Sequence, residues 1–145
     1  MYYDYRYYYR QQDHDLITNI AKAIDGEFNA IQCYNKLLKM VPTTKEKNVI
    51  SEIIKDENDH LGKFTQIYFK LTGRQPDVAK SNDCPKRLKD IFEFSFEDEQ
   101  ESVDFYLDIA NATDDENIRE VFTRAAADEQ NHAIWFLYFL TKTRL

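Results

Sequence analysis

Two segments of the 145-residue chain repeat one pattern at an offset of 72 positions. Apolar and polar residues both recur, including two copies of a Glu-x-x-His motif that each follow another glutamate by 30 positions. The matched pairs are Leu16 and Leu88, Ile24 and Phe96, Glu27 and Glu99, Ile31 and Val103, Tyr34 and Tyr106, Val49 and Val121, Asp56 and Asp128, Glu57 and Glu129, His60 and His132, and Phe64 and Phe136. Chance is a poor explanation for so many matches at one offset, so the sequence indicates an internal repeat.

Long helices are the expected elements of each repeat. The chain has only three glycines and three prolines, and its apolar residues recur at helical spacing. Pro42 and Gly73 interrupt that spacing, while segments 43–46 and 113–116 have the form of capping boxes that begin helices. The expected helices cover about residues 15–39, 43–71, 86–112 and 113–141. The sequence therefore predicts an all-α domain.

A polar connector at residues 73–85 separates the two repeats. Fully extended, this segment reaches ~40 Å, which is about the length of a 27-residue helix. Each repeat would form a tight antiparallel hairpin, and the connector would run back along the bundle between them. We therefore predict a four-helix bundle made of two helical hairpins joined by a long crossover.

Six charged residues of the repeat are expected to meet at one level of this bundle. Glu27 lies about 15 residues before the turn at Pro42 and Glu57 about 15 residues after it, so both lie ~22 Å from the turn. The second hairpin repeats this geometry, and each histidine shares a helix face with the glutamate three positions before it. The six residues are Glu27, Glu57, His60, Glu99, Glu129 and His132.

The helix faces that carry these six residues are expected to be buried. Ile24 and Ile31 flank Glu27 on its face, and Ile53 and Ile54 precede Glu57. Four ionised carboxylates in a core would cost far more than the ~5–15 kcal/mol stability of a domain unless they were compensated. Two divalent cations would balance the four negative charges. We therefore predict a buried site for two metal ions.

This arrangement resembles the di-metal carboxylate proteins of the ferritin-like superfamily, especially bacterioferritins and the erythrin domain of rubrerythrins, over about residues 15–141. The resemblance implies a ferritin-like four-helix bundle that holds two iron ions, or alternatively manganese, between the six residues. By that analogy Glu57 and Glu129 bridge the metals, while Glu27 and Glu99 are terminal ligands.

Four further residues receive roles through the same resemblance. In the family, tyrosines at the positions of Tyr34 and Tyr106 lie beside the metals and hydrogen-bond to ligands, which suggests a redox or tuning role; plain core packing is the alternative. Asp56 and Asp128 immediately precede the bridging glutamates. Aspartates at these positions would steady the ligand histidines through the other ring nitrogen.

The chain also departs from the pattern of these relatives. Ser102 stands where rubrerythrins usually carry an additional glutamate, and the two Cys-x-x-Cys motifs of a rubredoxin module are missing. We therefore expect no rubredoxin-type iron centre and a separate electron donor. With Met1 and Met40 as the only methionines, nothing supports the haem of bacterioferritins.

The expected function is that of a non-haem di-iron oxidoreductase, a peroxidase or ferroxidase with peroxide, dioxygen or Fe(II) as small substrates. Oxygen and nitrogen ligands do not separate iron from manganese, so a manganese catalase-like enzyme stays open. A non-enzymatic structural or iron-storage role, with assembly through the N-terminus, also stays open. A homodimer is expected by resemblance only.

The tyrosine-rich segment 1–12 holds six of the ten tyrosines. We expect it to form a flexible or locally docked tail ahead of a domain at 13–145. An interaction or oxidative cross-linking segment is the alternative.

Charge, hydropathy and cysteine content restrict the setting of the protein. A net charge of −7 without a basic stripe argues against a nucleic-acid partner. No apolar run approaches the ~20 residues that cross a membrane. Cys33 and Cys84 form no Cys-x-x-Cys pair, so we expect two free thiols in a reducing compartment and a cytoplasmic location.

Overall fold

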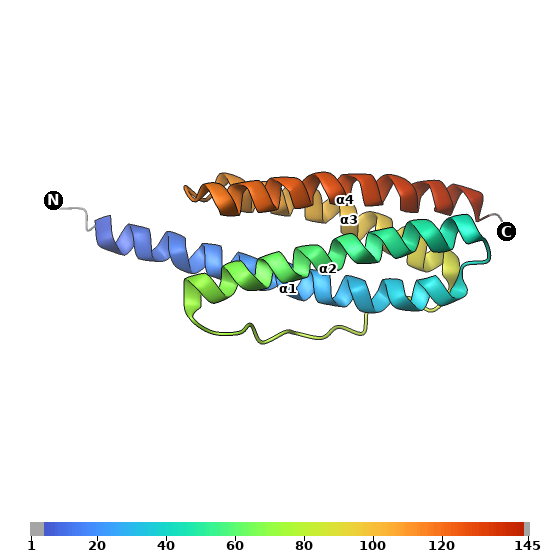
Figure 1. The fold of residues 1–145 in the computed structure, drawn as a ribbon, viewed down its shortest axis with the longest axis horizontal. Coiled ribbons are helices and arrows are strands. Elements are labelled where there is room, and N and C mark those ends of the chain that lie inside the picture. Colours follow the sequence, from blue (N-terminus) through green and yellow to red (C-terminus); the bar gives the residue numbers. More distant parts are fainter. Residues whose placement is uncertain (1–4, 144–145) are drawn as a thin grey trace.

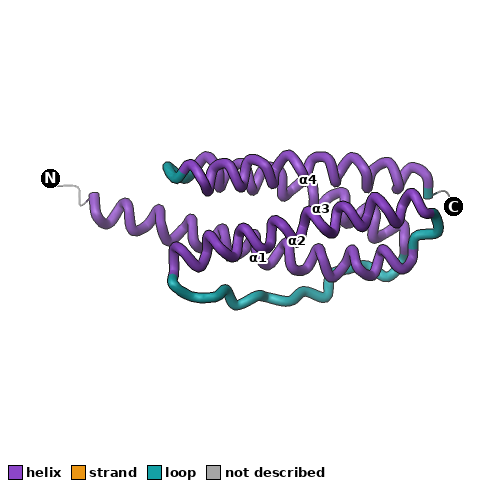
Figure 2. The backbone as a smooth tube through the Cα atoms, in the orientation of Figure 1, coloured by secondary structure: helices purple, strands orange, loops and turns teal. Residues whose placement is uncertain are grey.

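The computed structural model describes residues 5–143, with side chains from residue 13 onward, and contains four long helices and no strand within that range. The helices are α1 (Tyr5–Met40), α2 (Thr44–Thr72), α3 (Leu88–Asn111) and α4 (Glu116–Lys142). Figures 1 and 2 show two helical hairpins, with the segment between α2 and α3 running along the bundle. The predicted all-α four-helix bundle with a long crossover is confirmed.

Each helix packs against two others. α1 lies beside α2 and α3, and α4 lies beside α2 and α3, so α1 and α4 occupy one diagonal of the bundle. The direction of the chain in Figure 1 makes α2 antiparallel to α4. The two halves of the internal repeat therefore face one another in opposite directions across the bundle.

The first predicted capping box is confirmed at the start of α2. The Thr43 Oγ1 accepts a hydrogen bond from the backbone N–H of Glu46 at 3.1 Å, and the Thr43 N–H donates to Glu46 Oε2 at 3.1 Å. At the other end Gly73 adopts φ 71°, a left-handed conformation that favours glycine, and its N–H donates to Phe69 O at 2.8 Å. Both ends of α2 are thus determined by local sequence.

The second predicted capping box is wrong. Asp115 is the residue that caps α4, because its Oδ1 accepts from the Ile118 N–H at 3.0 Å. Thr113 instead closes the preceding turn, where its Oγ1 accepts from the Asp115 N–H at 3.1 Å. Aspartate caps a helix as well as threonine does, and here its position two residues later determines where the helix begins.

α1 begins at Tyr5, ten residues before the expected start near Asp15. Its first turns extend past the ends of the other helices (Figure 1). No glycine or proline lies in this part of the chain, so the helix of the bundle can propagate outward through it. Residues 1–4 of the tyrosine-rich segment lie outside the described residues, and the function suggested for that segment stays a prediction.

Two apolar clusters fill the bundle, one on each side of a central polar layer. The first contains Ile24, Phe64 and Phe122, and the second contains Leu37 and Phe136, among other residues. On every helix the buried charged residues fall between the members of the two clusters. The polar layer is therefore closed off by hydrophobic packing above and below.

The crossover is fastened to one face of α1. Asp25 accepts a hydrogen bond from the Ala79 N–H at 2.9 Å, and the Asn29 amide donates to Ala79 O at 2.8 Å. One turn further along, Cys33 forms a disulfide with Cys84, with a Cα–Cα distance of 5.5 Å. The expectation of two free thiols is wrong, because the path of the crossover brings together two cysteines 51 residues apart.

Within residues 5–143, none of the helices has both the length and the apolar character of a membrane span.

Candidate metal centre

All four helices contribute side chains to the polar layer. Each of the six residues predicted from the repeat faces the inside of the bundle, and none is more than 3 % exposed. α1 provides Glu27, α2 provides Glu57 and His60, α3 provides Glu99, and α4 provides Glu129 and His132. The antiparallel hairpins thus bring the six residues to one level, as equal distances from the turns require.

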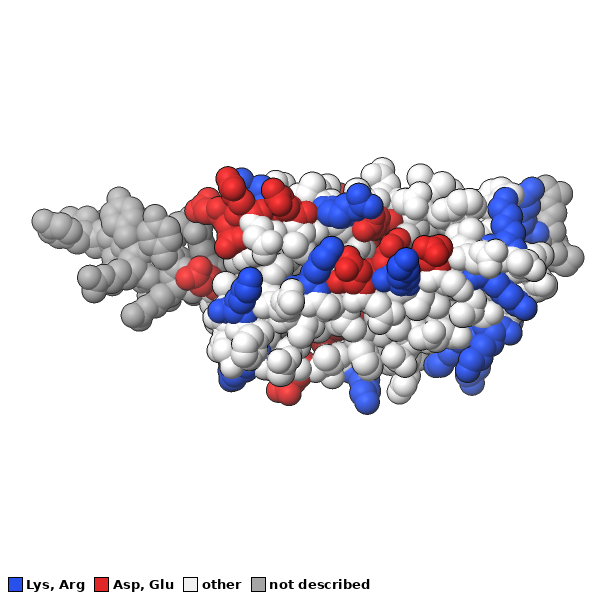
Figure 3. All heavy atoms as spheres, viewed as in Figure 1, with Lys and Arg blue, Asp and Glu red and all other residues white. Residues whose placement is uncertain are grey.

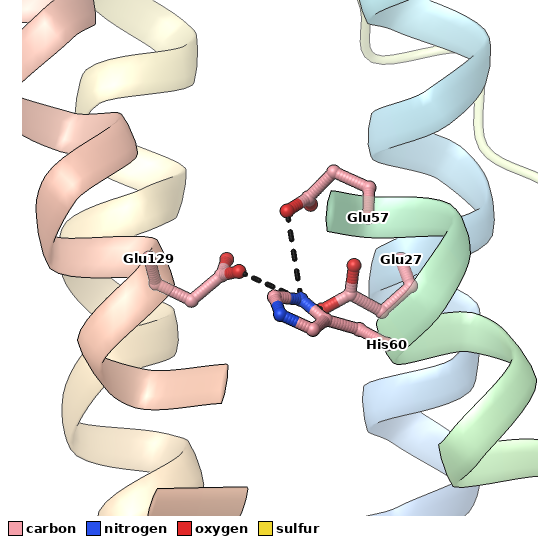
Figure 4. Close-up of side chains that lie close together, drawn as sticks. All are labelled: Glu27, Glu57, His60 and Glu129. Carbon is pink, nitrogen blue, oxygen red and sulfur yellow. Dashed lines mark ion pairs between the residues drawn. The ribbon is translucent and has the colours of Figure 1, made fainter. Parts of the chain in front are cut away.

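The six side chains form two overlapping groups of candidate ligands. One group consists of Glu27, Glu57, His60 and Glu129, and the other of Glu57, Glu99, Glu129 and His132. In each group one ligand atom per residue lies within 4.8 Å of the others. Figure 4 shows the first group, with Glu129 reaching from α4 toward three residues of the α1–α2 hairpin. Glu57 and Glu129 belong to both groups.

The histidines face the carboxylates with their Nδ1 atoms. His60 Nδ1 lies 3.2 Å from Glu129 Oε1 and 3.5 Å from Glu27 Oε1. His132 Nδ1 lies 3.1 Å from Glu57 Oε1. Of the four glutamates, the one nearest to each histidine Nδ1 is therefore the one that belongs to both ligand groups and lies on the other hairpin.

The hydrogen bonds of the layer test whether these residues fit metal ions. Seven buried side-chain atoms among the described residues have no hydrogen-bond partner, and six of them come one each from the six candidate ligands. They are Glu27 Oε2, Glu57 Oε1, His60 Nδ1, Glu99 Oε2, Glu129 Oε1 and His132 Nδ1. Leaving so many buried polar atoms unpaired is costly, whereas divalent cations would satisfy all six. The donor set fits two metal ions.

Aspartates of the opposite hairpin hold the histidines in place. The His60 Nε2 lies 2.9 Å from Asp128 Oδ2, and the His132 Nε2 lies 2.9 Å from Asp56 Oδ2. Each aspartate thus contacts the histidine of the other repeat, not the one in its own motif. A ring whose Nε2 donates to a carboxylate presents an unprotonated Nδ1 to a metal, which is the usual way in which proteins orient a ligand histidine.

Tyrosines form hydrogen bonds to Glu27 and Glu99, the two glutamates that each belong to only one ligand group. As with the aspartates, each tyrosine lies on the hairpin opposite to its partner. The Tyr34 hydroxyl on α1 donates to Glu99 Oε1 on α3 at 2.6 Å, and the Tyr106 hydroxyl on α3 donates to a carboxylate oxygen of Glu27 on α1. Both hydroxyls are directed at candidate ligands, so these tyrosines do more than fill the core.

One relative is similar to this chain over almost its whole length. The chain is 46 % identical over 139 residues to the uncharacterised protein YhjR of Bacillus subtilis (strain 168), a match that covers 96 % of this chain and 95 % of that protein. A family model described as Rubrerythrin matches residues 90–145. The chain belongs to the same family as YhjR, and its C-terminal part is similar to the Rubrerythrin family model.

Solved structures show the ferritin-like fold independently of close sequence similarity. A hypothetical protein from Pyrococcus furiosus matches with a TM-score of 0.78 at 17 % identity, covering 90 % of this chain and 92 % of that one. A structure from Bacillus anthracis str. Ames, described as ferritin like, diiron-carboxylate proteins, matches with a TM-score of 0.76 at 21 % identity, covering 89 % and 97 %. The ferritin-like fold together with the buried carboxylate and histidine cluster fits a two-metal carboxylate centre.

In the absence of metal ions, bound protons compensate the negative charges of this centre. Burial, reinforced by neighbouring carboxylates, raises the pKa of both Glu57 and Glu129. Burial opposes the charged form of His132, but Glu57 and Glu99 outweigh it and raise its pKa to about 11. The metal-free layer thus retains protons that cations would have to displace.

Sequence reasoning missed one polar residue of this ferritin-like core. Ser95 lies on α3 one turn before Glu99, is buried, and has a hydroxyl without a hydrogen-bond partner among the described residues. The repeat pairs it with Ala23, so a polar residue at an otherwise apolar position was the available signal. Ser102, which replaces a glutamate usual in rubrerythrins, donates its hydroxyl to Asp98 O at 3.0 Å and so remains within its own helix.

Proposed function

We propose that this protein is a non-haem di-iron oxidoreductase that reacts with peroxide or dioxygen, as a rubrerythrin-like peroxidase or a ferroxidase. The observation that carries the proposal is the pair of overlapping ligand groups that share Glu57 and Glu129. Two ions held by such groups would be bridged by the shared carboxylates, with Glu27 and Glu99 each on one ion. Each histidine would then complete one of the two sites.

Iron is favoured over manganese by the description of a solved structure of the same fold as a diiron-carboxylate protein. Bound iron would supply the electrons that reduce peroxide or dioxygen. Six side chains of which two are shared leave coordination positions that small substrates can occupy. A separate electron donor, or Fe(II) itself, would restore the reduced state.

The residues around the ligands have distinct tasks in this proposal. The apolar clusters exclude water from the layer, which strengthens each electrostatic interaction inside it. Asp56 and Asp128 hold the imidazole rings with Nδ1 directed inward. Tyr34 and Tyr106 hold one oxygen of Glu99 and Glu27, respectively, and leave the other oxygen free for an ion.

The first test is metal content. Protein purified without added metal and then loaded anaerobically with Fe(II) is expected to bind two ions per chain by elemental analysis. Glu57→Ala should bind fewer, because it removes an oxygen that both groups use. Glu93→Ala, an exposed position on α3, is the matched control and should retain two. Two bound ions in the Glu57→Ala variant would reject the ligand assignment.

The second test is reactivity. The loaded protein should consume hydrogen peroxide or dioxygen and change its visible absorbance as it does so. Protein that binds two irons but consumes neither oxidant would reject the enzymatic proposal while leaving the metal centre in place.

A further inference from the structure

A cavity opens between α2 and α4 directly beside one end of the metal centre. It measures about 270 Å³, and its lining includes Glu52, Asp56, Asn131, His132 and Trp135. On the face drawn in Figure 3, acidic and basic side chains both gather near the middle of the bundle, where Figure 1 shows α2 and α4 in front. The cavity therefore lies between the outer surface of α2 and α4 and the polar layer.

His132 forms the boundary between the cavity and the candidate ligands. The residue lines the cavity, yet its Nδ1 lies 3.1 Å from Glu57 Oε1 inside the layer and has no hydrogen-bond partner among the described residues. The residue is 1 % exposed, so it separates the two spaces almost completely. An ion that passed this ring would arrive directly among the ligands.

Asp56 offers an oxygen on the outer side of that boundary. Its Oδ2 lies 2.9 Å from His132 Nε2, and no hydrogen bond within the described part of the chain holds its Oδ1. The side chain is 44 % exposed. Glu52 lies one helical turn before it on α2 and lines the same cavity. Two carboxylates, those of Glu52 and Asp56, thus lie at the mouth of the cavity, and of their four oxygens only Asp56 Oδ2 contacts a histidine.

The repeat supplies an internal comparison, because the equivalent positions at the other end of the centre carry different residues. Arg124 replaces Glu52, and its Nε lies 3.1 Å from Oδ1 of Asp128, the counterpart of Asp56. With both oxygens engaged, the Asp128 side chain is only 18 % exposed. Lys63 stands in place of Trp135. A cation approaching His60 would meet Arg124 and also Lys63, which is paired with Asp59 at 2.7 Å. One approaching His132 meets Glu52 and Asp56, and the cation beside the cavity lining is Lys45, whose Nζ lies 5.9 Å from the ring centre of Trp135.

We propose that divalent cations reach the metal centre through the cavity beside His132, attracted by Glu52 and Asp56, and that Arg124 closes the equivalent path beside His60. This inference rests on the proposed metal centre and adds the side from which it is loaded. Carboxylates at a narrow mouth raise the local concentration of cations and speed their association. The same charges repel anions, so the path selects cations and neutral molecules.

The test measures the rate at which metal-free protein takes up Co(II), followed by visible absorption in a stopped-flow instrument at low ionic strength. Glu52→Arg recreates the arrangement of the other end, because an arginine there would reach Asp56 four residues on, as Arg124 reaches Asp128. Its loading should be about 10-fold slower than that of the wild type, and the difference should shrink as salt is added. The matched control is Glu120→Arg, an exposed position on α4 at the other end, with the same change in net charge.

Equilibrium binding separates this inference from the proposed centre. Both variants should still bind two Co(II) per chain, and Glu120→Arg should load at about the wild-type rate. If Glu52→Arg loads as fast as Glu120→Arg while both bind two ions, the path beside His132 is wrong. Equal slowing of both variants would attribute the effect to net charge and would also overturn it. Failure of the wild type to bind two ions would instead overturn the metal centre and the path together.

Discussion

Removal of the Cys33–Cys84 disulfide is expected to lower the free energy of unfolding by about 4 kcal/mol. The bond joins positions 51 residues apart, and closing a loop of that length removes about 14 cal/mol/K of entropy from the unfolded chain. Near 60 °C, unfolding changes the entropy by about 2.1 cal/mol/K per residue, or about 0.3 kcal/mol/K for 145 residues. The melting temperature should therefore fall by about 13 °C.

Thermal melting of metal-free protein, followed by far-ultraviolet circular dichroism, measures this effect. Cys84→Ser removes the bond at the half-buried cysteine and leaves Cys33, which is buried, as a small apolar side chain. Asp83→Ser is the control, since it changes an exposed neighbour in the same crossover and should shift stability by less than about 0.5 kcal/mol. Wild-type protein melted with a reducing agent should behave as Cys84→Ser does.

A small shift would refute the reasoning. If Cys84→Ser lowers the melting temperature by less than about 4 °C, the disulfide does not restrict the unfolded chain to the extent that loop closure requires. Metal content is a second check, because no candidate ligand lies in the crossover. Cys84→Ser should retain two ions per chain, and a loss of metal would show that the crossover also holds the metal centre in position.

Three further predictions concern the layer and the core. Tyr34→Phe removes the 2.6 Å hydrogen bond to Glu99 and should weaken metal affinity about 10-fold in competition with a chelator; unchanged affinity would contradict a role for the hydroxyl. Because the pKa of His132 is raised from 6.5 to about 11, its stabilising proton is fully present below about pH 6.5 and lost as the pH rises toward 11. Metal-free protein should accordingly melt lower at pH 9 than at pH 7, while Co(II) binds more tightly at the higher pH; the opposite trends would refute this. Phe122→Ala, at a fully buried position, should cost about 3–5 kcal/mol in urea unfolding, whereas Ile134→Ala, at a position 60 % exposed, should cost less than about 0.5 kcal/mol.

Helix periodicity and the repeat were sufficient to predict most of the bundle. Glycine and proline mark the ends of the helices, and equal spacing from the turns places Glu27 beside Glu57 without knowledge of the tertiary structure. Helix ends were less predictable. Thr113 and Asp115 both suit a cap, and only the path of the turn assigns the cap to Asp115.

Contacts between the hairpins were beyond sequence reasoning. The disulfide depends on where the crossover meets α1, and a chain that reaches ~40 Å can meet that helix at many places. The crossed pairs, such as Tyr34 with Glu99, likewise depend on which faces the two hairpins present to one another. A motif read within one repeat cannot reveal that its aspartate serves the histidine of the other.

The sequence by itself determined the repeat, the helices and the identity of the six residues that the bundle brings together, because these follow from local periodicity and from distances along antiparallel helices. Only the tertiary structure decided that the two ends of the centre differ. Glu52 and Arg124 each lie one turn from an aspartate on their own helix, but only the packing of α2 against α4 brings Asp56 to His132 and Asp128 to His60. Packing thereby places the difference in charge between Glu52 and Arg124 beside the metal centre, where it can affect how ions reach it.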